Sequence, residues 1–133
     1  MPFYRAKRAA IAIYVFCFSV GIVSHAADFI AFGPRPYHWA PAGFEIFWSS
    51  LIGLDAVAVA LFLARRIRPA LLFSAAIMLA VVVLNYYCLT VLEISQFAVS
   101  VPLQALFLGF VLGSLPFLWP DSAARIDEVG RKG

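Results

Sequence analysis

Three side chains that are capable of acid–base chemistry lie in segments that are otherwise strongly apolar. Asp55 is near the middle of one such segment, and His25 and Asp28 are three residues apart in another. A carboxyl group at the centre of a bilayer costs about 3 kcal/mol even on the most lenient insertion scales. Without a cation it favours its neutral form, which can donate a proton, whereas the ionised form attracts a cation such as an amine. We therefore predict Asp55, Asp28 and His25 as the catalytic candidates.

Each of these three residues also has a structural alternative. His25 and Asp28 share one helical face, where they can form a proton shuttle or a simple ion pair. Polar side chains in membrane bundles also hold helices together, at about 0.6 kcal/mol for an average interhelical hydrogen bond. Asp55 is the strongest functional candidate, because no lysine or arginine lies at its depth.

Further polar side chains lie at comparable depths in the other apolar segments. At a rise of 1.5 Å per residue, Asp55 is about 16 Å below the outer end of its segment, and Asn85 and Gln104 are each about 10 Å below theirs. The 3-4 spacing from Glu45 through Trp48 to Asp55 places these side chains on one face. We expect a polar pocket in the outer half, with Asp55 at its floor and Trp48 with Tyr86 or Tyr87 as aromatic walls. Such a pocket suits a small amphipathic molecule. The predicted ligand-binding residues are Glu45, Trp48, Ser49, Asn85, Tyr86 and Gln104.

Four long apolar stretches must position these side chains. The chain has 133 residues, of which 64% are hydrophobic and 13% charged, against about 25% charged in soluble domains. A stretch of about 20 apolar residues crosses the hydrocarbon core as a helix, which satisfies its own backbone hydrogen bonds. We predict an all-α, polytopic membrane protein: an antiparallel bundle of four transmembrane helices in one domain over residues 1–120, followed by a polar tail over 121–133. The predicted spans are 9–32, 44–64, 70–92 and 97–119.

The basic residues predict the orientation. All the lysines and arginines except Arg35 lie before the first span, between the second and third, or after the fourth. Basic residues collect on the cytoplasmic side, so both termini are predicted to be cytoplasmic. The net charge of +3 follows from this pattern and requires no nucleic-acid partner. The start of the chain also resembles a signal peptide, but its apolar run continues through Phe32, which favours a retained span.

Three remaining features concern partners and cofactors. Gly109 and Gly113 form a GxxxG pattern, which permits close helix approach either within the bundle or in a homodimer. Cys17 and Cys88 are expected at different depths, so no disulfide is predicted. No metal site or cofactor is expected, because neither histidine has a cysteine or an acid at ligand spacing.

The chain resembles the EXPERA architecture, the membrane fold of the emopamil-binding protein and the sigma-2 receptor. The resemblance is carried by Ser24-His25 with Asp28, by the loop that contains proline, tyrosine and tryptophan, and by residues 44–55. It implies a central cavity that binds sterols or cationic amphiphiles through acidic residues, and in some members a double-bond isomerisation. Two features depart from the family: the first outer loop is shorter, and His25 is followed by an acid at three residues rather than by glutamate at four. We carry over the ligand pocket for Asp28 and Asp55, but not the isomerase reaction.

Three functions remain open from the sequence. The leading expectation is a protein that binds a membrane lipid or another hydrophobic or cationic amphiphile, with acid–base isomerase chemistry on it as an extension. The alternatives are an accessory or scaffold subunit without chemistry and a small proton-coupled exporter, in which Asp55 would be the essential carboxylate. The chain is also similar to small bacterial four-span proteins, which favours a bacterial inner membrane over a eukaryotic endomembrane.

Overall fold

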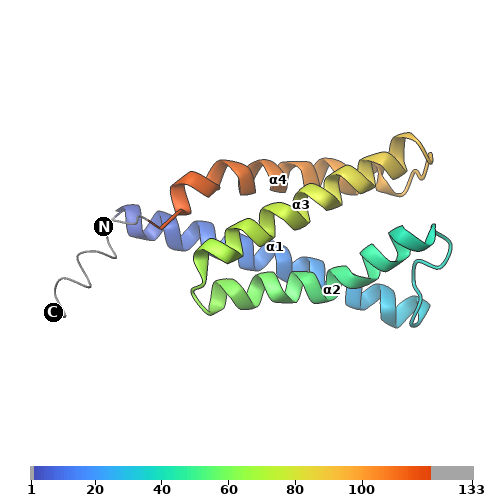
Figure 1. Cartoon of the computed structure of the whole chain (residues 1–133), viewed down its shortest axis with the longest axis horizontal. Helices are drawn as coiled ribbons and strands as arrows, with labels where there is room; N and C mark the ends of the chain where they lie inside the picture. Colours follow the sequence, from blue (N-terminus) through green and yellow to red (C-terminus); the bar gives the residue numbers. More distant parts are fainter. Residues whose placement is uncertain (1, 121–133) are drawn as a thin grey trace.

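The computed structural model describes residues 2–120, which form four helices. These are α1 (Pro2–Phe32), α2 (Ala42–Leu63), α3 (Ile67–Thr90) and α4 (Phe97–Leu118). Successive helices run antiparallel (Figure 1), and all four are long and apolar enough to cross a membrane. The prediction of an all-α, multi-pass membrane bundle is therefore confirmed. The predicted polar tail, 121–133, lies outside the described residues.

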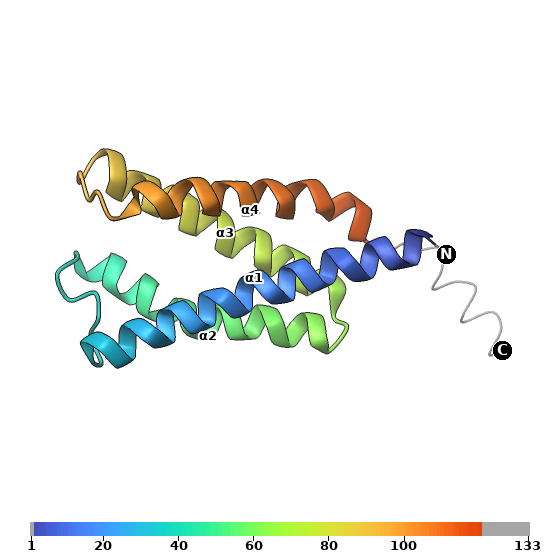
Figure 2. The same ribbon diagram turned by 180° about the vertical axis from the view of Figure 1, so that it is seen from behind.

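The four helices form two hairpins, α1 with α2 and α3 with α4. The hairpins lie together near the α2–α3 connection and diverge toward the opposite end, which holds the connections 33–41 and 91–96 (Figures 1 and 2). The first helix begins and the last helix ends at the same end of the bundle (Figure 1). We call this the inner end, and the diverging end the outer end, after the orientation that the basic residues predict.

A glycine marks the end of α1, and a proline lies at the start of α3. α1 stops at Gly33, whose φ of +81° is a left-handed conformation that glycine adopts without a Cβ clash. α3 begins at Ile67, three residues before the predicted span, so Pro69 lies in its first turn, where a missing N–H breaks no helical hydrogen bond. α1 begins at Pro2, seven residues before the predicted span, because a helix can extend past the apolar stretch that defines a span.

The inner half of the bundle contains a buried polar contact that the sequence pattern does not predict. Tyr14 on α1 has no exposed surface. Its hydroxyl group donates to the carbonyl oxygen of Val111 at 3.1 Å and lies 2.9 Å from Oγ of Ser114. Its ring packs against Phe62 of α2 and Phe110 of α4, with centroids 4.7 and 5.3 Å away. This tyrosine links α1 to α4, because a buried hydroxyl group needs a hydrogen-bond partner.

The two glycines of the GxxxG pattern lie on the outside of the bundle. Both Gly109 and Gly113 are exposed, and a Cβ added to either would meet no atom within 4 Å. The pattern is therefore not used for helix packing within the part of the chain that the structure describes. A homodimer through these glycines stays a prediction.

Candidate functional site

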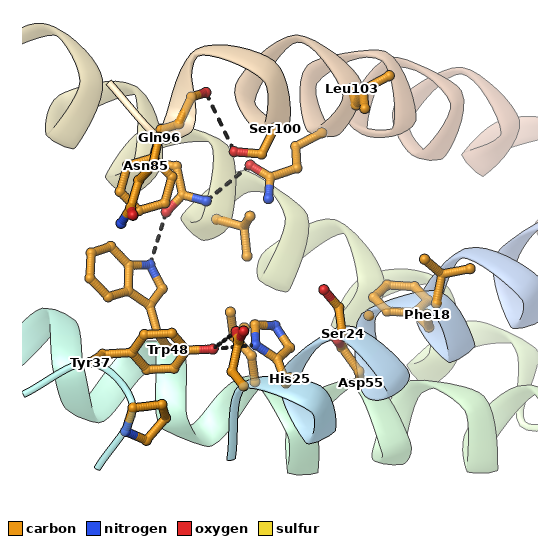
Figure 3. Close-up of a pocket in the computed structure, with 18 of the residues that line it drawn as sticks. Phe18, Ser24, His25, Tyr37, Trp48, Asp55, Asn85, Gln96, Ser100 and Leu103 are labelled. Atoms are coloured by element: carbon orange, nitrogen blue, oxygen red, sulfur yellow. Dashed lines mark hydrogen bonds between the residues drawn. The ribbon is translucent and has the colours of Figure 1, made fainter. Parts of the chain in front are cut away.

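A cavity of about 960 Å³ lies in the outer half of the bundle (Figure 3). All four helices and the 33–41 connection contribute to its walls, which are mainly apolar and aromatic. This volume is at the upper end of the range of about 300–1,000 Å³ that is typical of small-molecule sites. The cavity lies where the two hairpins diverge, so its position follows from the fold.

Asp55 of α2 lines the cavity and is 6% exposed. Its carboxyl group lies against Gly21 of α1: a Cβ added to Gly21 would overlap Oδ2 of Asp55 and would lie 3.2 Å from its Cγ. Within residues 2–120, the one ion pair joins other residues and no hydrogen bond involves Asp55. A buried carboxyl group without a partner is costly, so this group is available to a cationic or hydrogen-bonding ligand.

Tyr37 connects the outer loop to the two other acid–base candidates on α1. Its hydroxyl group donates to Oδ2 of Asp28 at 2.6 Å and lies 2.9 Å from Nδ1 of His25. Burial and the bond to Asp28 raise the pKa of Tyr37, so the hydroxyl group keeps its proton. Because that single proton points to Asp28, the hydroxyl oxygen accepts from an Nδ1–H of His25. In neutral His25, the other nitrogen, Nε2, is then the acceptor.

Three side chains from three helices form a chain of hydrogen bonds on another wall. The indole Nε1–H of Trp48 donates to Oδ1 of Asn85 at 2.9 Å, as Figure 3 shows, and Nδ2 of Asn85 donates to Oε1 of Gln104 at 2.9 Å. These bonds join α2, α3 and α4. Trp48 and Asn85 are only 4% and 3% exposed, so the geometry of the chain is fixed by the surrounding packing.

Aromatic rings surround Trp48 at the outer end of the cavity. The centroids of Tyr37 and Trp39 are each 5.7 Å from that of Trp48. Phe44 lies at 5.5 Å and Phe97 at 5.2 Å. Pairs at this separation gain about 0.5–1.5 kcal/mol beyond their area burial, so the outer wall is held rigidly around the indole.

The structure brings together some of the predicted site residues and separates others. Asp28 lines the cavity, whereas Glu45, Ser49 and Tyr86 do not. The predicted residues that line it are His25, Asp28, Trp48, Asp55, Asn85 and Gln104.

Glu45, Ser49 and Tyr86 were predicted to line the pocket, and the structure places all three elsewhere. Glu45 accepts two hydrogen bonds from Arg35, both at 2.8 Å, at the end of α2. Ser49 and Tyr86 directly follow Trp48 and Asn85, so each is turned by about 100° from a residue that lines the cavity. Tyr86 is consequently 58% exposed.

Sequence reasoning missed Tyr37 and Gly21. Tyr37 was considered only as part of the outer loop and not as a site residue, because nothing in a loop sequence shows that its hydroxyl group turns back toward α1. Gly21 did carry a signal: Phe18, Gly21, His25 and Asp28 follow 3-4 spacing, and all four line the cavity. A glycine on that face indicates close approach by a neighbouring side chain, which here is Asp55.

Comparison with known proteins identifies no family for this chain. No protein family, no curated protein and no solved structure matches the chain. The resemblance to the EXPERA architecture therefore stays a prediction. Within the described residues, no group of three His, Cys, Asp or Glu side chains could hold a metal ion.

Proposed function

We propose that the protein binds a cationic amphiphile of lipid-like or sterol-like size in the outer-half cavity. The observation that carries this proposal is the position of Asp55: its carboxyl group is 6% exposed, borders the cavity and has no partner within residues 2–120. An amine placed beside it would supply the missing positive charge. The ligand would thereby satisfy a group that the protein alone leaves unpaired.

The walls of the cavity support an apolar body for this ligand. Phe18, Met78, Val81 and Phe107 line the space, and burying apolar surface stabilises a complex by about 25 cal/mol per Å² before the costs of binding are subtracted. A ligand with one polar head on an apolar body matches a site that has a few polar groups among apolar walls. These features favour an amphiphile over a small hydrophilic cation.

The cavity also holds groups that could move a proton. Tyr37 is hydrogen-bonded to both His25 and Asp28, and all three residues line the same space as Asp55. Acid–base chemistry would require Asp55 or the imidazole of His25 to reach a reacting carbon of the bound ligand. The proposal is therefore binding, and isomerase chemistry would be an extension of it.

The test is native mass spectrometry of the protein released from detergent. Wild type should retain a small molecule, and Asp55→Asn should lose it, because loss of a charge-assisted hydrogen bond of about 1.5–3 kcal/mol weakens binding by roughly 10- to 100-fold. Glu45→Gln is the matched control: it also removes a carboxylate, but one that does not line the cavity and pairs with Arg35 instead. It should retain the ligand.

Two other results would favour the alternative functions. Bare protein in all variants, together with co-purification of a larger complex, would contradict ligand binding and indicate an accessory subunit. Release of protons on addition of a cationic substrate, abolished in Asp55→Asn, would instead indicate a proton-coupled exporter.

A further inference from the structure

The hydrogen bonds from Trp48 through Asn85 to Gln104 can run in only one direction. An indole N–H is a donor and never an acceptor, so Asn85 must present its carbonyl oxygen to Trp48. The amide nitrogen of Asn85 then points to Gln104, which must accept with Oε1. The orientation of both amides is thus determined by the chemistry of one tryptophan.

Reversal of the direction of these hydrogen bonds is strongly disfavoured. If Asn85 turned over, its NH₂ group would face the indole N–H, and two donors would be left unpaired. A buried donor that is left unpaired loses its hydration and gains no hydrogen bond in return, which is costly. Because Trp48 and Asn85 are 4% and 3% exposed, water cannot readily replace the lost bonds. The Nε2 of Gln104 therefore remains the last donor in this series of hydrogen bonds.

Gln104 lines the cavity, so its Nε2 group belongs to the site. Within residues 2–120, Nε2 of Gln104 donates to no other group. Gln104 comes from α4, whereas Asp55 comes from α2 and lies against α1. Figure 3 shows Asn85, the donor to Gln104, and Asp55 on opposite sides of the space. The cavity thus has an unpaired carboxyl group on one side and an oriented N–H donor on another.

We propose that the N–H group of Gln104 selects ligands that carry a hydrogen-bond acceptor in addition to their amine. The class is an amino lipid whose polar end also contains a carbonyl, ester or ether oxygen. This inference rests on the proposed function, because it names the ligand class of the same cavity. A plain alkylamine would satisfy Asp55 but leave the Gln104 donor unpaired, and sites built to hydrogen-bond a ligand group discriminate strongly against analogues that lack it.

The experiment compares two probes, dodecylamine and the dodecyl ester of glycine, by their dissociation constants. Both carry one amine on an apolar chain, and only the ester has a carbonyl oxygen beside it. At about pH 6 both amines are protonated. The variant is Gln104→Glu, which keeps the oxygen that accepts from Asn85 but replaces the Nε2 donor by a second acceptor oxygen. Its added charge acts on both amines, so the ratio of the two affinities isolates the contact with the carbonyl group.

The ratio of ester affinity to amine affinity should fall by about tenfold or more in Gln104→Glu, the value of one lost hydrogen bond of about 1.4 kcal/mol. Ser49→Ala is the control, because Ser49 does not line the cavity, and it should keep the wild-type ratio. An unchanged ratio in Gln104→Glu, with dodecylamine still bound, would overturn this inference and leave the proposed function intact. If neither probe bound to wild type, the proposed function and this inference would both be wrong.

Discussion

The carboxyl group of Asp55 occupies the space that a side chain at position 21 would fill. Only glycine leaves α1 open at this point, and a methyl group there would overlap Oδ2 of Asp55. Gly53 on α2 differs, because a Cβ added to it meets no atom within 4 Å. Substitutions at Gly21 and Gly53 can therefore be compared to separate the packing requirement at Gly21 from the general effect of replacing glycine in a helix.

Gly21→Ala is expected to destabilise the protein by about 1–3 kcal/mol, because a well-packed site must move to admit the methyl group. The displaced carboxyl group should also bind a cationic amphiphile more weakly. Gly53→Ala should be neutral or slightly stabilising, since alanine favours a helix over glycine. Denaturant titration and ligand retention check both variants. Equal stability in the two variants would show that Asp55 does not depend on Gly21.

At the scale of the helices, Tyr14 holds α1 against α4 in the inner half. Its hydroxyl group bonds to Val111 and Ser114, and its ring contacts Phe62 and Phe110. The cavity begins beyond this contact, where Phe18 and Phe107, both cavity-lining, meet with ring centroids 5.5 Å apart. Tyr14 thereby closes the inner end of the space between α1 and α4.

Tyr14→Phe is expected to cost about 0.6–1.7 kcal/mol, the range from the average to the largest interhelical hydrogen bonds measured in membranes. The packing of the ring stays, so the fold should persist while α1 separates more readily from α4. Spin labels on the two helices would report a broader distance distribution. Tyr4→Phe is the control, because Tyr4 is 63% exposed. A distribution as narrow as that of wild type would mean that ring packing alone holds the helices.

The positions of the helices could be predicted from the sequence, whereas the contacts between them could not be predicted to the same degree. Length and hydropathy predict all four spans because a membrane requires about 20 apolar residues. The 3-4 spacing of Trp48 and Asp55 placed both on one face, and both line the cavity. The spacing could not decide whether Tyr86 and Glu45 face the cavity, because it shows which residues share one face of a helix but not how that helix is rotated against its neighbours. Nor could it pair Tyr14 with Ser114, because their contact depends on how two distant helices pack.

At the scale of the whole molecule, α4 has two different faces. Gln104 and Phe107 line the cavity, whereas Gly109 and Gly113 are exposed on the outside. Gly109 lies about 140° around the helix from Gln104, at about 100° per residue. A partner helix on the glycine face would therefore leave the cavity uncovered.

A second copy of this chain is the partner that the GxxxG pattern predicts, because small residues let two helix backbones approach closely in lipid. Replacing Gly109 and Gly113 with leucine should convert dimers to monomers, as counted by single-molecule photobleaching in liposomes. Gly53→Leu is the control, since Gly53 is also exposed and lies on α2. The double variant should keep ligand binding, because its changes face away from Gln104. A monomeric wild type, or a dimer that survives both leucines, would contradict dimerisation through α4. Loss of ligand binding on monomerisation would show instead that the partner copy helps to form the cavity.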